Sequence, residues 1–412
     1  MLELMVFAVL GIGLGIVTGL VPGLHINNIL PVLLPLLVFI GDPYYLAVMI
    51  VSMAVVQIFV GFIPSIFLGA PEADTSLSTL PGHRLLQEGR GFEAIKLTVV
   101  GGLGSLLVSL VVLVALSPYF PTFYEASRPY IQYVLIGMVA FMVISERKPA
   151  RIAHAALIIL LSGVLGFLVL QSSLVNQQNV LFPTLAGLFG ISILATSIMQ
   201  KSRIPEQSGG DEIRSRKIDL VKSIMVGAVA GMMVGFLPAI GVSQAAAMFQ
   251  YVGGLSEART FLSSLSGINV ANEVFSLNSV YLIGNPRSGA SVAIERIISD
   301  VTFNDVFLFV SVIIFSAGVG ALVSLFLGKK IPPILARINY KWLSIGIISM
   351  MVAMIFVITG FYGIMIASVA SAIGILCNYL GTKKSNCMGV LIVPSIFFFT
   401  GLTPIVSSVL GI

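Results

Sequence analysis

The feature that most constrains this chain is its series of continuous apolar stretches, about fourteen in all, which uses up most of the 412 residues. Most of them approach the ~20 residues that a helix needs to span a bilayer. A transmembrane β-barrel is excluded, because its strands would alternate apolar and polar residues over about ten positions. The sequence therefore predicts an all-α polytopic membrane protein with little length left for a soluble domain.

Composition and charge support this class. The chain is 57% apolar and 9% charged, whereas soluble domains carry about 25% charged residues. The net charge of +5 records membrane orientation through the positive-inside rule, so we predict no nucleic-acid partner. Cys377 and Cys387 lack metal-ligand spacing, and we expect neither a disulfide framework nor redox chemistry from them. The apolar N-terminus has no basic n-region or small-residue cleavage site, which favours a first membrane segment over a signal peptide.

Two motifs recur at a nearly constant offset. The Gly-x-x-x-Gly-x-x-Pro motif of residues 15–23 returns at 231–239, and the Gly-x-Pro motif with a following serine at 69–76 returns at 284–291. Such self-similarity is typical of a duplicated chain. We predict an N-terminal repeat at 1–200, a polar cytoplasmic linker at 201–218 and a C-terminal repeat at 219–412.

Each repeat contains about seven apolar segments. Because seven is odd, the second repeat would run upside down relative to the first, which gives two inverted-topology repeats typical of secondary transporters. With both termini outside a cell membrane, nineteen of the 22 Lys and Arg residues fall on the cytoplasmic side, all but Arg128, Arg287 and Arg296. The segments are expected at 3–20, 26–40, 45–68, 93–117, 130–145, 151–170, 180–200, 219–237, 242–252, 258–283, 301–328, 342–360, 362–380 and 388–410.

The segment at 242–252 is too short to cross a hydrocarbon core about 30 Å thick. Segments one and two of each repeat are therefore expected to form a re-entrant hairpin, whose non-helical tip must line a cavity. A helix that restarts at the tip presents free N–H groups to an anion. A structural role for the histidine at the first tip stays equally open. The residues assigned to substrate binding are Pro22, Gly23, His25, Asn27 and Asn28 at the first tip, and Pro238, Ser243 and Gln244 at the second.

Glu273 is the one acid near the middle of an apolar segment, and Asn269 shares its helix face. Intramembrane ionisable groups are costly and usually functional, so we expect Glu273 to carry the coupling ion; a protonated Glu273 that caps a helix or bonds another side chain is the alternative. The offset between the second pair of motifs, applied backwards from Asn272, leads to Gln57. We assign Asn269, Asn272 and Gln57 to substrate or ion binding, although such amides also join helices.

Charged residues follow the third segment of each half. We assign Glu72 and Asp74 to ion coupling, and Pro286, Arg287 and Ser288 to substrate binding. Solvation at the membrane interface is the alternative for both groups. No metal site is predicted, and the sequence lacks a zinc-protease motif, an intramembrane aspartate pair, a rhomboid-like serine motif and a P-loop, so we expect no enzyme. A scaffold would not need broken helices with polar tips in both halves.

Four motifs at these positions are similar to a known family. They lie at 19–23 (Gly-Leu-Val-Pro-Gly), at 81–91 (Pro-Gly-His-Arg-Leu-Leu-Gln-Glu-Gly-Arg-Gly), at 182–190 (Phe-Pro-x-x-x-Gly-Leu-Phe-Gly) and in the pair Ala271-Asn272 with Gly284-x-Pro286-x-Ser288. With them the chain resembles the large membrane subunit (TctA) family of the tripartite tricarboxylate transporters. The resemblance implies a secondary transporter that imports carboxylates with an ion gradient, together with a small membrane subunit and an extracytoplasmic binding protein.

The chain departs from the family pattern at the first break, where Pro-Glu-Ala-Asp-Thr at 71–75 replaces the usual Pro-Gly-Glu-Ala-Ser. It is also shorter than most large subunits, and it resembles the stand-alone relatives of the family, a resemblance that implies neither tricarboxylate specificity nor the two partner subunits. We expect a transporter of a small di- or tricarboxylate-like anion, coupled to H⁺ or Na⁺, without a cofactor; a homodimer is compatible with it. A polyprenyl-phosphate flippase is the alternative, because flippases also use re-entrant Pro-Gly hairpins.

Overall fold

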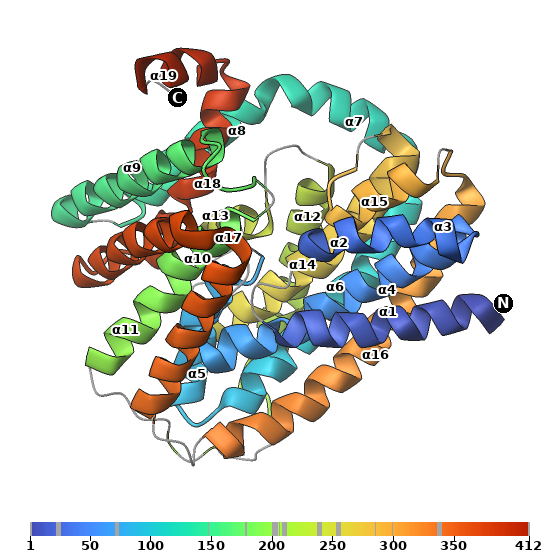
Figure 1. The fold of residues 1–412 in the computed structure, drawn as a ribbon, viewed down its shortest axis with the longest axis horizontal. Coiled ribbons are helices and arrows are strands. Elements are labelled where there is room, and N and C mark those ends of the chain that lie inside the picture. The colour runs from blue at the N-terminus through green and yellow to red at the C-terminus, as the bar shows by residue number, and fades with distance from the viewer. Residues whose placement is uncertain are drawn as a thin grey trace.

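The structure is a computed structural model, shown in Figure 1. Every regular element among the described residues is a helix, which confirms the predicted all-α class. The described residues are 2–21, 26–70, 74–146, 148–177, 179–199, 205, 207, 212–236, 241–252, 257–284, 286–298, 300–335 and 340–410.

The helices of residues 1–200 follow the expected apolar segments, with two additions that hydropathy did not predict. These are α5 and α7, which are short and mix polar with apolar side chains. The helices are α1 (Leu2–Leu20), α2 (Ile26–Leu33), α3 (Leu37–Ile40), α4 (Pro43–Val60), α5 (Thr79–Gln87), α6 (Gly91–Leu116), α7 (Phe120–Ser127), α8 (Ile131–Ile144), α9 (Pro149–Gln171), α10 (Leu181–Leu185) and α11 (Ser192–Met199).

The second half departs from its expected segments at the C-terminal end. The single segment expected at 388–410 is two helices bent by 111°, because Gly401 adopts a left-handed conformation (φ 71°) between them. The short helix α15 was also not predicted. The helices are α12 (Lys217–Phe236), α13 (Val242–Val252), α14 (Ala258–Ile283), α15 (Gly289–Ile297), α16 (Phe303–Leu335), α17 (Tyr340–Tyr379, with a non-helical Gly360), α18 (Gly389–Phe399) and α19 (Thr403–Leu410).

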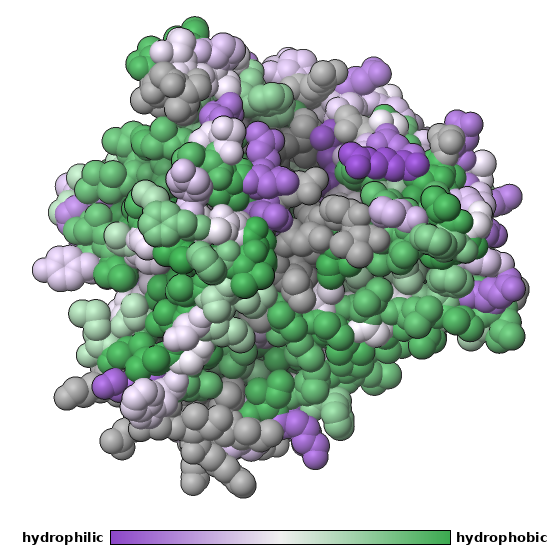
Figure 2. Space-filling model, in the orientation of Figure 1, coloured by the Kyte–Doolittle hydropathy of each residue, from purple (hydrophilic) through white to green (hydrophobic). Residues whose placement is uncertain are grey.

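Among the described residues, seven helices are long and apolar enough to cross a membrane, or eight if the bent pair α18–α19 is one span. The chain is therefore a multi-pass membrane protein. Figure 2 shows hydrophobic residues over most of the visible face, with many of the hydrophilic residues at its upper and right margins. This is the surface that a surrounding bilayer requires.

Helix bounds in the two halves correspond closely. Helix α4 and the π-helical turn after it cover 43–68, and α14 covers 258–283, so that both bounds are shifted by the same interval. Both end at a glycine in the left-handed region, Gly69 (φ 64°) and Gly284 (φ 59°). A residue with a Cβ is strained in this conformation, which explains why glycine stands at both positions. These shared bounds fit the predicted duplication.

The packing of the first helix of each half on the third is also matched. A Cβ on Gly15 of α1 would lie 2.9 Å from the Cβ of Val56 on α4, and one on Gly231 of α12 would lie 2.4 Å from the Cβ of Ala271 on α14. Real Cβ atoms do not approach this closely, so glycine allows both pairs of helices to touch. Small residues play this role in membrane helix packing.

The helices lie in two groups in Figure 1. The right-hand group contains α1 to α4, α6, α12 and α14 to α16, and the left-hand group contains α8 to α11, α17 and α18. Within the first group, helices of one half pack on helices of the other half: α6 packs on α14, and α16 packs on α4. Similarly, α9 packs on α18, and the π-helical turn Ala186–Ile191 packs on α17. The two halves are therefore interlocked rather than placed side by side as separate domains.

Candidate functional site

Helix α14 is the most polar of the long helices in the described part of the chain. At 26 residues it is about 39 Å long, yet it is not among the seven apolar spans. Buried polar side chains cost free energy unless they are hydrogen-bonded. Some of them bond within the helix, as when the Asn278 amide donates to the Val274 carbonyl at 2.7 Å. The buried polar residues of α14 are Thr260, Ser263, Ser264, Ser266, Asn269, Glu273, Ser276, Asn278 and Ser279.

A cluster of hydroxyl groups lies where α14 ends and α15 begins. The hydroxyls of Ser276 and Ser291 are 3.0 Å apart, and both accept from the backbone N–H of Arg287, at 3.1 and 2.9 Å. The Ser288 hydroxyl caps α15 by accepting from the N–H of Ser291 at 3.1 Å. These bonds satisfy the backbone of a break that would otherwise be unpaired within the protein.

Glu273 lies beside this break. Its side chain is 5% exposed, and its Oε1 accepts from the Ser288 hydroxyl at 3.2 Å. The structure thus brings together two residues that the sequence assigned to the site from different segments. A carboxyl group bonded to a hydroxyl fits a coupling residue, and it also fits the alternative in which Glu273 bonds another side chain.

The first half has its own hydroxyl cluster, after Gly69. The Ser65 hydroxyl lies 2.7 Å from that of Ser78 and donates to the Thr75 carbonyl at 3.1 Å. The neighbouring Ser76 is fully buried, and its hydroxyl lies 3.0 Å from that of Ser243, at the start of α13 in the other half. The break in one half therefore contacts the helix that follows the expected tip in the other half.

Asn269 makes a second link between the halves. Its amide donates to the backbone carbonyl of Asp74 at 3.2 Å and to that of Leu265 at 3.1 Å. Gln244, next to Ser243, is 4% exposed, and no hydrogen bond is found to its Oε1 among the described residues. Buried groups from α13, α14 and the residues after Gly69 thus converge on one polar region.

The remaining assigned residues fall in several places. Gln57 is buried on α4, while Asn272, Asp74, Pro286, Arg287 and Ser288 are partly buried. Asn27 and Asn28 belong to α2, of which only the backbone is described at these positions. Pro22, Gly23, His25, Glu72 and Pro238 lie outside the described residues.

Arg287 contacts a residue that the sequence did not assign. Its Nη2 donates to the Tyr124 hydroxyl at 3.2 Å, and its guanidinium carbon lies 5.6 Å from the centre of the Tyr124 ring. Tyr124 belongs to α7, which hydropathy did not predict as a helix. Among the unassigned serines, only Ser76 and Ser291 carried a signal, since they occupy equivalent positions of the repeated motif. Serines that bond within helices are too common to be singled out.

A second polar centre lies at the start of α6. Glu93 is 3% exposed and pairs with Arg259 at 3.1 Å and with Arg90 at 3.1 Å. It also accepts from the backbone N–H of Arg214 at 2.8 Å. These contacts join the first half, the linker side and the start of α14, and they give Glu93 a structural role.

A third buried group lies between α11, α17 and α18. The ammonium of Lys384 donates to the Gly374 carbonyl at 2.8 Å, to the Ser192 hydroxyl at 2.9 Å and to Asn378 at 3.3 Å. Cys377 and Cys387 are both buried and free. Three neutral acceptors in the described part of the chain thus compensate for the buried charge of Lys384.

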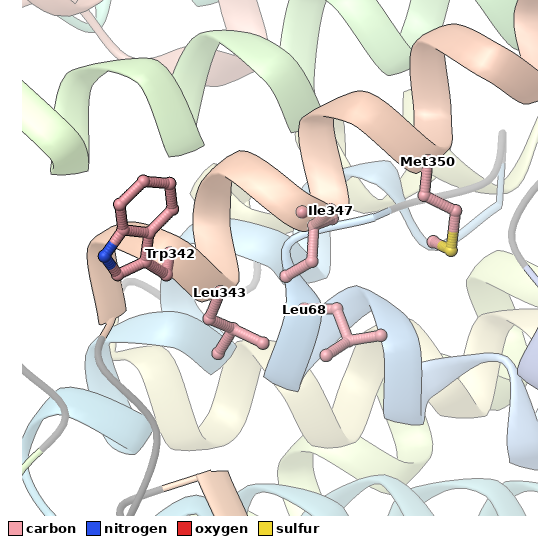
Figure 3. Close-up of a pocket in the computed structure, with 6 residues that line it drawn as sticks. Leu68, Trp342, Leu343, Ile347 and Met350 are labelled. Carbon is pink, nitrogen blue, oxygen red and sulfur yellow. The ribbon is translucent and has the colours of Figure 1, made fainter.

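One hollow of about 400 Å³ opens elsewhere, between the π-helical turn after α4 and the start of α17. Figure 3 shows Leu68 on one side and Trp342, Leu343, Ile347 and Met350 on the other. Its lining is apolar and offers no group to hold an anion. We take the polar region around Glu273 as the candidate site, because it brings together buried polar groups from both halves.

Comparison with known proteins identifies the family. The model of the tripartite tricarboxylate transporter TctA family matches residues 5–389. The chain belongs to the TctA family. A TctA relative in Methanocaldococcus jannaschii, the uncharacterized protein MJ1079, is 30% identical over 405 residues, which cover 96% of this chain and 98% of the relative. No solved structure matches the chain. This TctA protein thus belongs to a transporter family, in which the TctA chain is the large membrane subunit.

Proposed function

We propose that the chain is a secondary active transporter that moves a small di- or tricarboxylate across the cell membrane, driven by H⁺ or Na⁺. Family membership supports the transporter class and the carboxylate substrate. The observation that carries the proposal is the pair of bonds between the halves, Ser76 to Ser243 and Asn269 to the Asp74 carbonyl. A site built from both halves is the arrangement that inverted-repeat transporters use for alternating access.

The architecture of this proposal is two inverted repeats, at 1–200 and 219–412, joined by a cytoplasmic linker, with both termini outside. The shared helix bounds and glycine contacts of the two halves support the duplication. The starts of α2 and α13 would face the substrate from two hairpin tips. Free N–H groups and the positive end of each helix dipole favour an anion there.

The residues would divide the work by their chemistry. Gln57, Asn269 and Asn272 would bind the substrate through their amides, and Arg287 or His25 would pair with its charge. Glu273 would carry the coupling proton or help to bind Na⁺. Its burial next to the Ser288 hydroxyl supports this assignment, since an intramembrane carboxyl group is costly unless it serves a function. Glu72 and Asp74 would assist it.

Partners follow from the family alone. A small membrane subunit and an extracytoplasmic binding protein would assist the delivery of substrate without being required for transport, and a homodimer would be compatible with the exposed apolar faces. An enzymatic function is not part of the proposal. The transported ion and the substrate are the only small molecules that it requires.

The test is uptake by sealed vesicles that contain only the purified chain. Labelled citrate and succinate are offered with a proton gradient, with a Na⁺ gradient, and after each gradient is collapsed with an ionophore. We expect accumulation that depends on one gradient and disappears when that gradient is collapsed. Absence of carboxylate accumulation, combined with transfer of a short-chain polyprenyl phosphate between leaflets, would replace the proposal with a flippase.

A further inference from the structure

Helix α7 links three parts of the second half. It is an eight-residue helix between α6 and α8, and in Figure 1 it runs along the upper edge of the molecule between α15 and α8. One face is exposed, with Phe123 at 47% and, just before the helix, Tyr119 at 67%. Phe120 and Tyr124 are four residues apart and so share a side of the helix, on which Phe120 is buried and Tyr124 is half-buried.

Phe120 anchors α7 in the core. It is 3% exposed, and its ring stacks on Phe236 at 4.1 Å between centroids and meets Phe275 edge-on at 5.8 Å. Phe236 is the last residue of α12, and Phe275 lies two residues after Glu273 on α14. This aromatic contact fixes the position of α7 relative to the candidate site.

Tyr124 then reaches the break beside Glu273. Its hydroxyl accepts from Nη2 of Arg287 at 3.2 Å, and its ring lies under the guanidinium at 5.6 Å. A cation is attracted to an aromatic face within about 6 Å. Arg287 is thereby held by two different interactions from one side chain, while its backbone N–H is held by the hydroxyls of Ser276 and Ser291.

We propose that Tyr124 is a positioning residue for Arg287 and, through it, a determinant of affinity for the carboxylate substrate. The inference rests on the proposed function, in which Arg287 pairs with the substrate's charge. A guanidinium binds a carboxylate best when its planar fork is already oriented, because a flexible side chain loses conformational freedom on binding. Tyr124 supplies that orientation, and Phe120 holds Tyr124 in place.

The test compares two substitutions at Tyr124 in the vesicle assay. Tyr124→Phe keeps the ring and removes the hydroxyl, and we expect its half-saturation concentration for citrate or succinate to rise about threefold. Tyr124→Leu removes both interactions, and we expect a rise of about tenfold with a maximal rate within about twofold of the unmodified chain. Tyr119→Leu is the matched control, because Tyr119 is exposed, and it should leave both values unchanged.

A double-substitution cycle shows whether Tyr124 acts through Arg287. In an Arg287→Gln background, Tyr124→Leu should cause no further rise in the half-saturation concentration. An equal rise in both backgrounds, or a lower maximal rate without a change in half-saturation, would overturn the proposal.

The same double-substitution cycle is also measured as changes in the melting temperature of the purified protein without substrate. This measurement separates the positioning role of Tyr124 from the proposed transport function. Non-additive shifts for Tyr124→Leu and Arg287→Gln would support their contact even if no carboxylate were transported. Additive shifts would refute the positioning role even if uptake were normal. Failure of the unmodified chain to accumulate any carboxylate would instead count against the proposed function.

Discussion

Two buried carboxyl groups in this protein make different kinds of contact. Glu93 is fixed by two arginines and a backbone N–H, whereas Glu273 accepts from the hydroxyl of Ser288. A carboxylate that pairs with two largely buried positive charges cannot be changed without removing a partner from both of them. A carboxyl group that accepts from a hydroxyl can exchange a proton or a cation without taking that partner's charge from it. The comparison separates a structural acid from a candidate coupling acid.

The largest expected effect is a loss of stability when Glu93, the structural acid, is replaced. Glu93→Gln leaves Arg90 and Arg259 without their shared partner, although they are only 13% and 16% exposed. Arg259 keeps its contact with Glu257 at 3.2 Å, so the cost in unfolding free energy should reach at most the ~3–5 kcal/mol of a fully broken buried pair. We expect a marked fall in melting temperature and in the yield of folded protein. Glu88→Gln is the control, because its contact with Arg259 is long (3.7 Å) and 41% exposed; a similar fall there would remove the distinction.

The next effect concerns the packing of α6 on α14, the helices that carry Glu93 and Glu273. A Cβ on Gly101 of α6 would lie 2.0 Å from the Ser263 carbonyl oxygen of α14. Gly101→Ala must therefore push the helices apart, and we expect a loss of about 1–3 kcal/mol in stability. Gly137→Ala on α8 meets no atom within 4 Å and should be neutral or stabilising by up to about 1 kcal/mol. Equal melting temperatures for the two variants would contradict the close packing of α6 on α14.

The smallest effect is a pH dependence of the protein's stability, caused by His83, which lies outside the candidate site. His83 on α5 is 3% exposed, and burial lowers its pKa below the usual value. Because the unfolded state then takes up a proton at higher pH than the folded state, the free energy of unfolding decreases as the pH falls below about 6.5. The melting temperature should fall more between about pH 7.5 and 5.5 for the unmodified chain than for His83→Asn. Parallel curves would exclude His83 as the cause.

Much of the fold could be predicted from the sequence. The bounds of α14 were predicted at 258–283, as observed, because charges and glycines mark both ends of that segment. The paired glycines at 69 and 284 were also visible as a repeated motif, since their backbone conformation tolerates little else. Apolar length and special backbone positions are local properties, so they can be recognised without a structure.

The sequence missed short helices, a bend at a glycine and contacts between distant residues. Helices α5, α7 and α15 are too short and mixed to be detected by hydropathy, and the bend before α19 depends on the conformation of Gly401. The pair Glu93–Arg259 spans 166 residues, and the Arg287–Tyr124 contact spans 163. Among the site residues, the bond from Ser288 to Glu273 joins two assigned residues, whereas the sequence indicated Tyr124 only as part of an aromatic connection at the membrane interface and not as a partner of Arg287.

The most direct test of the central claim compares exchange with accumulation in Glu273→Gln. Vesicles that contain this variant are assayed for the exchange of labelled for unlabelled substrate and, separately, for uptake against a gradient, with Glu295→Gln on the exposed side of α15 as control. If Glu273 carries the coupling ion, Glu273→Gln keeps exchange but loses gradient-driven accumulation, while Glu295→Gln keeps both. Full accumulation by Glu273→Gln at every pH would contradict the account and leave Glu273 as a structural acid like Glu93.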